Sequence, residues 1–178
     1  MHLFIIIIIS VLFSESLTTE ELNSLQDYKN SDYKSSEHFK IFDSIINKEI
    51  DIEDPVICIL LYEASLFNDN LTLANKYINM AISNDKANQS YRDLSFKLEE
   101  YRDLLNRAKK TYEKDLFDES IRDYSSIINT YPNRALPHYE QGVVYRSMKD
   151  YKNAISNFKN AKNINPNKDL YGKAIISI

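Results

Sequence analysis

The fold of this chain is decided by residues 151–166, YKNAISNFKNAKNINP, and by an earlier copy at residues 117–132, FDESIRDYSSIINTYP. The two stretches lie 34 residues apart. They match at an aromatic position, a small position, a second aromatic position and a proline. Apolar residues recur in both at the three- and four-residue spacing of an amphipathic helix. A fixed period of this length predicts a stack of repeated units, each made of two helices.

The last unit shows its two helices most clearly. We expect a first helix over about residues 136–148, a short turn, and a second helix over about residues 151–164. Gly142 on the first helix and Ala154 on the second have little side-chain bulk, so the two helices can approach closely. Pro166 has no amide hydrogen and therefore ends the second helix.

This pattern resembles the tetratricopeptide repeat (TPR), and the residues that carry the resemblance are Gly142, Tyr145, Tyr151, Ala154, Phe158, Ala161 and Pro166. The resemblance implies an all-α fold, a right-handed α-solenoid of helix-turn-helix TPR repeats. One TPR spans residues 135–168 and another spans 101–134, after a degenerate TPR at 55–85 whose internal turn is expected to be about two residues shorter. Residues 17–54 are predicted to form an N-terminal helical region with a degenerate half-copy, and residues 169–178 a capping helix.

A long helix is predicted between the degenerate repeat and the next one. Ala74 and Ser120, which hold the same place in their units, are 46 residues apart instead of 34, so about twelve residues are inserted. The apolar rhythm continues across residues 86–100 without glycine or proline. One helix over about residues 86–114 would therefore fuse this linker to the following repeat. A dimeric coiled coil is the alternative interpretation.

The first sixteen residues have the composition of a signal peptide. An apolar run from Leu3 to Phe13 is too short to cross a bilayer, and Ser14 and Ser16 form a small-x-small cleavage pattern. A buried element of the fold and an uncleaved signal-anchor are the alternatives. We therefore expect the endoplasmic reticulum lumen or secretion, since no retention tail is recognised, and membrane attachment only if the signal is uncleaved. In that compartment Asn70 and Asn88, each in an Asn-x-Ser/Thr tripeptide, are candidate glycosylation sites.

Composition excludes most chemistry. The 178 residues include 2 glycines, 1 cysteine and 3 histidines, and the net charge is −4. A glycine-rich phosphate loop, an internal disulfide, a multi-cysteine metal site and a nucleic-acid face are therefore not expected. His138 is interpreted as a packing residue, Cys58 as a buried structural thiol, and Asp54 with Pro55 as the start of a helix. We expect no cofactor, no metal and no enzymatic activity.

Recognition of a protein partner is the remaining function. In TPR proteins the first helix of each repeat lines a concave groove, and the resemblance places there Arg102, Leu105, Lys109, Tyr112, Leu136, Tyr139, Val143 and Arg146. An exposed apolar and aromatic stripe of this kind favours binding of a protein. The alternative is that the capping helix or the long helix covers it. The lysine, asparagine and arginine clamp for acidic Hsp70 and Hsp90 tails is absent from the corresponding positions.

The order of a weak repeat, a long helical insertion and two further repeats resembles the C-terminal TPR region of endoplasmic-reticulum-lumenal DnaJ subfamily C co-chaperones. Residues 85–124 carry most of this likeness. The J domain of that family, with its His-Pro-Asp triad, is lacking in this chain. The resemblance implies an adaptor of the secretory pathway that binds an unfolded client, an extended polypeptide or a chaperone partner. The alternative is a structural scaffold or secreted interaction protein that assembles one specific complex.

Overall fold

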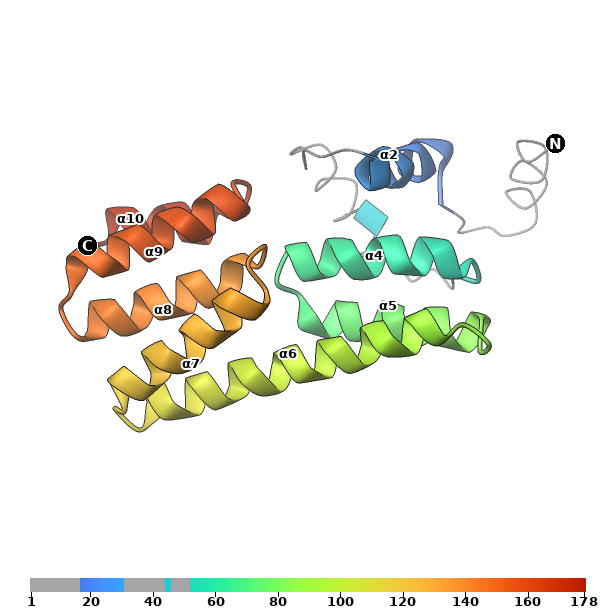
Figure 1. Cartoon of the computed structure of the whole chain (residues 1–178). Helices are drawn as coiled ribbons and strands as arrows, with labels where there is room; N and C mark the ends of the chain where they lie inside the picture. The colour runs from blue at the N-terminus through green and yellow to red at the C-terminus, as the bar shows by residue number, and fades with distance from the viewer. Residues whose placement is uncertain (1–16, 31–43, 46–51) are drawn as a thin grey trace.

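The computed structural model describes residues 17–30, 44–45 and 52–178, and all regular structure in them is helical (Figure 1). The prediction of an all-α solenoid of TPR-type helix pairs is confirmed. The expected signal peptide at residues 1–16 lies outside the described residues, as does most of the expected half-copy. The helices are α2 (Thr19–Asn30), α4 (Pro55–Phe67), α5 (Leu71–Asn84), α6 (Gln89–Glu113), α7 (Phe117–Thr130), α8 (Ala135–Ser147), α9 (Tyr151–Ile164) and α10 (Asp169–Ile176).

Three helix pairs, α4–α5, α6–α7 and α8–α9, close with the same three-residue turn. Its middle residue adopts a left-handed backbone, with φ of 57° at Asp69, 59° at Asp115 and 63° at Lys149. In each turn the middle amide and the next one donate to carbonyls of the last helical turn. The expectation that the first of these turns is shorter is therefore wrong. Aspartate tolerates the left-handed conformation better than most residues, so two of the turns need no glycine.

The last helix pair packs closely because of Gly142. A Cβ atom at this position would lie 2.6 Å from Cε1 of Phe158 and 3.2 Å from the carbonyl oxygen of Ala154. Phe158 is fully buried, so its ring has no space into which it could move. The close crossing expected from the sequence is therefore present, and it requires glycine.

The long helix α6 joins two stacks of helices. Its N-terminal half shares a core with α4 and α5, and its C-terminal half shares a core with α7 and α8. Figure 1 shows the two stacks side by side along α6. The twelve inserted residues add about 18 Å to the helix at 1.5 Å per residue, and this displaces the first pair toward the N-terminal end of α6.

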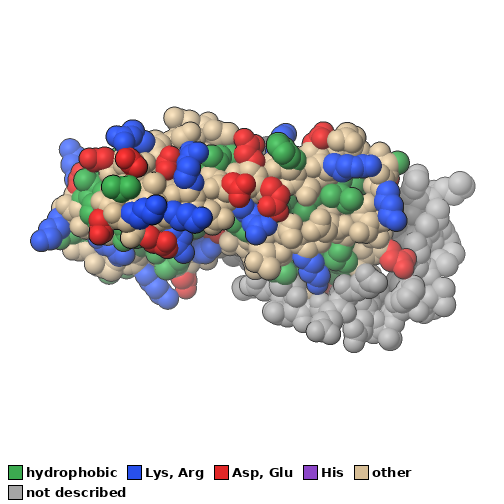
Figure 2. Space-filling model, turned by 90° about the horizontal axis from the view of Figure 1, so that it is seen from below, with side chains coloured by type: hydrophobic (Ala, Val, Ile, Leu, Met, Phe, Trp, Pro, Cys, Tyr) green, Lys and Arg blue, Asp and Glu red, His purple; other side chains and the backbone are tan. Residues whose placement is uncertain are grey.

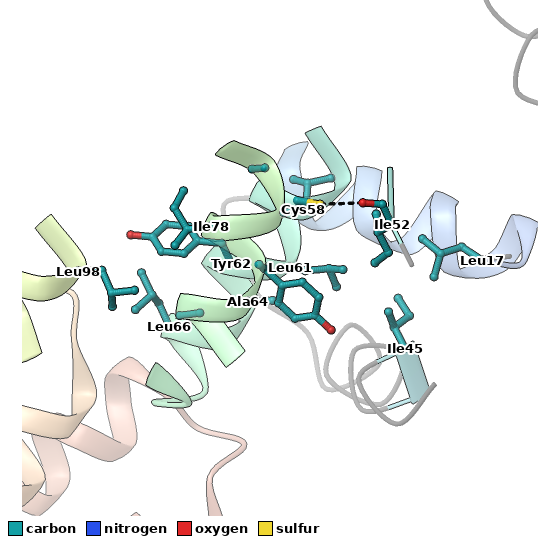
Figure 3. Packing of buried hydrophobic residues seen from close by; sticks show 14 residues of the cluster. Leu17, Ile45, Ile52, Cys58, Leu61, Tyr62, Ala64, Leu66, Ile78 and Leu98 are labelled. Atoms are coloured by element: carbon teal, nitrogen blue, oxygen red, sulfur yellow. Dashed lines mark hydrogen bonds between the residues drawn. The ribbon is translucent and has the colours of Figure 1, made fainter. Parts of the chain in front are cut away.

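The core of the first stack combines aliphatic side chains with Tyr62 and Tyr77, and it includes the single cysteine (Figure 3). Cys58 is buried on α4, and its thiol donates a hydrogen bond to the carbonyl oxygen of Ile52 at 3.4 Å. Helix α4 begins as the sequence predicts, with Pro55 in its first turn and the Asp54 carboxylate accepting from the amide of Val56 at 2.8 Å. Cys58 is thus placed as a structural thiol.

Candidate functional site

The apolar residues predicted to line the concave groove are largely engaged in packing. Leu105 is only 8% exposed, and Leu136 packs into the same core. The Tyr139 ring lies between the rings of Phe158 and Tyr171, with centroid distances of 5.6 and 5.3 Å, and Val143 packs against the same part of the molecule. Because Tyr171 belongs to α10, the C-terminal helix covers part of the predicted stripe.

The polar members of the predicted groove lie at its surface. Lys109 is 67% exposed in its side chain and forms a 4.0 Å ion pair with Glu113. The hydroxyls of Tyr112 on α6 and Ser147 on α8 are hydrogen-bonded at 2.9 Å, so successive repeats meet there. Arg146 lies over the Phe158 ring at 5.8 Å. We name the surface formed by Lys109, Tyr112, Glu113, Arg146 and Ser147 the open strip.

Arg102 does not join the open strip through any contact in the structure. Its guanidinium forms a 2.9 Å ion pair with Glu99, one turn earlier on α6. This pair is solvent-exposed and therefore contributes little to stability.

The other end of the concave side is closed by the turn between α4 and α5. The Asp69 carboxylate, 2% exposed, accepts from the Lys168 ammonium at 2.8 Å and from the Tyr171 hydroxyl. The side-chain amide of Asn165 donates to the carbonyl oxygen of Phe67 at 2.9 Å. We name these interactions the closing contact. They join residues about one hundred positions apart, so the first stack is anchored to the last repeat (Figure 1).

Burial and charge at the closing contact raise the pKa of two groups, Tyr171 and Glu140. Burial, together with the Asp69 carboxylate, raises the pKa of the Tyr171 phenol, which therefore stays protonated and donates. Nearby on α8, burial raises the pKa of Glu140, and the positive charge of Lys109 opposes this rise. A raised pKa means that the surroundings of Glu140 disfavour its negative charge.

The sequence alone did not single out Asp69, Asn165, Lys168 or Tyr171. Their meeting depends on the displacement of α4 and α5 along α6. A usable signal was present, because the turn residues Asp69 and Asp115 are equivalent and an aspartate there leaves its carboxylate at the tip of a helix pair. The length of the insertion would then place only the first of the two opposite the last repeat.

Each candidate glycosylation residue caps the N-terminus of a helix, Asn70 that of α5 and Asn88 that of α6. Asn70 is exposed, and its side-chain oxygen accepts from the amide of Leu73 at 3.1 Å. Asn88 is half-buried, accepts from the amide of Ser90 at 3.1 Å, and donates through its amide nitrogen to Asp85 at 3.2 Å. Because a glycan bonds to the amide nitrogen, Asn70 is the more accessible acceptor of the two.

His138, on α8, is the one histidine that lies within the described residues. Nδ1 of His138 is buried and has no hydrogen-bond partner among the described residues, and burial lowers the pKa of this imidazole. Within residues 17–30, 44–45 and 52–178, no group of three or more histidine, cysteine, aspartate or glutamate side chains is placed to hold a metal ion. In the same residues, no helix has both the length and the apolarity needed to cross a membrane.

No family model matches the chain, and no curated protein sequence matches it. Among solved structures it is similar to MamA of strain AMB-1, with 13% identity, a TM-score of 0.39 and coverage of 89% of this chain and 84% of MamA. It is also similar to MamA of Desulfovibrio magneticus RS-1, with 10% identity, a TM-score of 0.35 and coverage of 90% and 84%. A third structure, YrrB, described as a TPR protein with an unusual peptide-binding site, has 17% identity, a TM-score of 0.36 and coverage of 84% and 66%. These TM-scores lie below 0.5, so the TPR-type fold of this chain rests on its own helix pairs and turns.

Proposed function

We propose that this chain is a protein-interaction adaptor of the secretory pathway that holds an extended or unfolded polypeptide on its open strip. In this role it would resemble the TPR part of a lumenal co-chaperone. The observation that carries the proposal is the open strip itself. It is formed by two successive repeats, and it stays exposed where the rest of the concave side is covered by α10 or by the closing contact.

The chemistry of the open strip suits a polypeptide backbone. The Lys109 ammonium and the Arg146 guanidinium are donors that an extended chain can meet with its carbonyl oxygens. The Ser147 hydroxyl already donates to the carbonyl oxygen of Val143, and the Tyr112 hydroxyl is bonded to Ser147, so the two hydroxyl oxygens are acceptors for the amides of that chain. Tyr112 packs on Phe117 with a centroid distance of 5.9 Å, so its ring has a defined position. A tyrosine held in this way offers contact area at a small cost in conformational entropy.

The secretory assignment rests on the apolar run from Leu3 to Phe13. We expect a C-terminally tagged chain to enter the endoplasmic reticulum and to carry a glycan on Asn70. A cytosolic location of the tagged chain would remove the secretory part of the proposal. It would leave polypeptide binding to be judged by itself.

Binding is tested with a reduced and alkylated, permanently unfolded polypeptide as the probe. The variant Lys109→Glu/Ser147→Glu changes two exposed residues of the open strip. Its matched control is Lys159→Glu/Asn160→Glu, which makes the same change in charge at exposed positions of α9. We expect the strip variant to weaken binding by about tenfold, which corresponds to about 1.4 kcal/mol, and the control to leave it unchanged. Equal binding by both variants would contradict a site on the open strip.

A further inference from the structure

A second surface lies on the opposite side of α6 from the open strip. Its members recur at three- and four-residue intervals, so they share one face of the helix. At about 100° per residue, that face is rotated by about 180° around the helix axis from the side that carries Lys109 and Tyr112. It surrounds a shallow hollow of about 390 Å³ lined by Phe96, Glu99, Glu100, Asp103, Leu104 and Arg107. We name this surface the outer face of α6.

Helix α7 borders the outer face only along the C-terminal half of α6. Arg107 forms a 3.1 Å ion pair with Asp123 of α7, and Glu100 accepts from the hydroxyl of Tyr131 at 3.2 Å. Before residue 100, α6 runs beyond α7. The inserted residues thus create a length of helix with one side packed on α5 and the other side open.

Phe96 stands on this open side with 74% of its surface exposed. It is not needed for the core, because Leu94 and Leu98 face α4 and α5 on the opposite side of the helix. Leu104, half-buried, extends the apolar area to the edge of α7. A large aromatic side chain beside a hollow is the usual form of an energetic anchor at a protein interface.

The charges around Phe96 indicate which partner fits. Of the three carboxylates beside Phe96, that of Glu99 is already paired with Arg102, whereas Glu100 and Asp103 are in no ion pair within the described residues. Arg107 is paired with Asp123, and Arg92, one turn before Phe96, donates to backbone carbonyls. Asp103 is exposed and makes no ion pair within the described residues. Figure 2 shows acidic side chains over the middle of the molecule seen from the α6 side, with Lys and Arg side chains on both sides of them and hydrophobic side chains nearby. The negative charges of Glu100 and Asp103 are therefore the feature that a basic segment would complement.

A second copy of this chain is a poor match for the same surface. Two outer faces brought together would oppose carboxylates to carboxylates, and like charges in contact are costly. The chain as a whole is acidic, with a net charge of −4, so electrostatic steering between copies is also unfavourable.

We propose that the outer face of α6 is a docking site for a basic amphipathic segment of a partner protein. One large apolar side chain of that segment would fill the hollow beside Phe96 and Leu104. Its lysine or arginine residues would face Glu100 and Asp103. This site goes beyond the proposed function, because it lies away from the open strip and would hold a second protein while an extended polypeptide occupies the first site.

The test uses a phage-displayed random peptide library selected on the full chain. We expect the recovered peptides to be rich in lysine or arginine and to carry one large apolar residue. Their affinity should fall by about fivefold or more with Phe96→Ala and again with Asp103→Lys, since anchors and facing charges at interfaces contribute about 1 kcal/mol or more. The matched controls are Ile176→Ala, another exposed apolar residue, and Glu119→Lys, another exposed acidic residue. Affinity should also decline as salt is added, because exposed charges are screened.

Three outcomes would overturn the proposal. The selection could recover no peptide that binds the full chain, or only acidic or neutral peptides. The recovered basic peptides could also bind Phe96→Ala and Asp103→Lys as tightly as the original chain. A concentration-dependent dimer that Phe96→Ala dissolves would instead assign the surface to a second copy. The variants of the open strip leave this surface intact, so failure of the proposed function and failure of this site are distinguishable.

Discussion

Replacing Asp69 by asparagine tests whether the closing contact holds the two stacks together. Asparagine has nearly the same shape, tolerates the left-handed backbone at this position, and can still accept a hydrogen bond from Tyr171. The substitution therefore removes the negative charge that faces Lys168 and changes little else. Any loss of stability can then be attributed to that charge.

The expected loss follows from burial. Breaking a buried ion pair by removing one partner costs about 3–5 kcal/mol. Asp69 is 2% exposed, but the side chain of Lys168 is 29% exposed and can regain part of its hydration. We therefore expect Asp69→Asn to lower the free energy of unfolding by about 2 kcal/mol.

Urea unfolding followed by circular dichroism measures this loss. The matched control is Asp115→Asn, which changes the equivalent residue of the α6–α7 turn, where φ is nearly the same and the side chain is exposed. We expect the control to change the free energy of unfolding by less than about 0.5 kcal/mol. In a double-mutant cycle with Lys168→Met, a coupling energy of about 1 kcal/mol or more is expected. If Asp69→Asn and Asp115→Asn are alike, or the coupling energy is near zero, the closing contact does not stabilise the fold as we infer.

Three further predictions concern packing and pH. Gly142→Ala should destabilise the fold by about 1–3 kcal/mol, because the added Cβ meets the buried Phe158 ring. Gly172→Ala should be neutral or stabilising by up to about 1 kcal/mol, because its Cβ would make only ordinary contacts at 3.8 Å. Thermal unfolding of the two variants compares them. Because the pKa of Glu140 is raised in the folded state, this residue lowers stability as pH rises above its ordinary value of 4.5, so Glu140→Gln should flatten that decline and raise stability at neutral pH. The pKa of His138 is lowered in the folded state, so its contribution to the free energy of unfolding is complete above the ordinary value of 6.5 and is lost as the pH falls toward the folded-state pKa. His138→Leu should therefore remove this loss of stability in acid. If the two variants leave the dependence of stability on pH unchanged, the pKa shifts assigned to Glu140 and His138 are refuted.

The fold was predictable because its signals are local. The aromatic, small and proline positions at residues 117–132 and 151–166 repeat at one spacing, and an uninterrupted apolar rhythm marks α6. The expectation of a shorter turn after α4 is wrong for an equally local reason. Helix α4 lacks the TPR signature residues, so the sequence does not locate its C-terminal end, and the backbone shows the same turn at Asp69 as at Asp115.

The state of the concave side was harder to predict because it depends on long-range geometry. Whether Tyr139 is exposed depends on where Tyr171 of α10 lies. Whether Asp69 reaches Lys168 depends on a displacement of about 18 Å along α6, the length of about twelve helical residues. Periodicity assigns a residue to a face of its own helix. It does not state which distant element covers that face.

The most direct test of the central claim is site-specific photocrosslinking to the unfolded polypeptide probe. A photoreactive benzoylphenylalanine replaces Ser147 on the open strip in one variant and Asn160 on the exposed side of α9 in another. We predict a crosslink to the polypeptide from position 147 and none from position 160. Crosslinking from position 160 alone, equally from both, or from neither would contradict the claim that this chain holds extended polypeptide on its open strip.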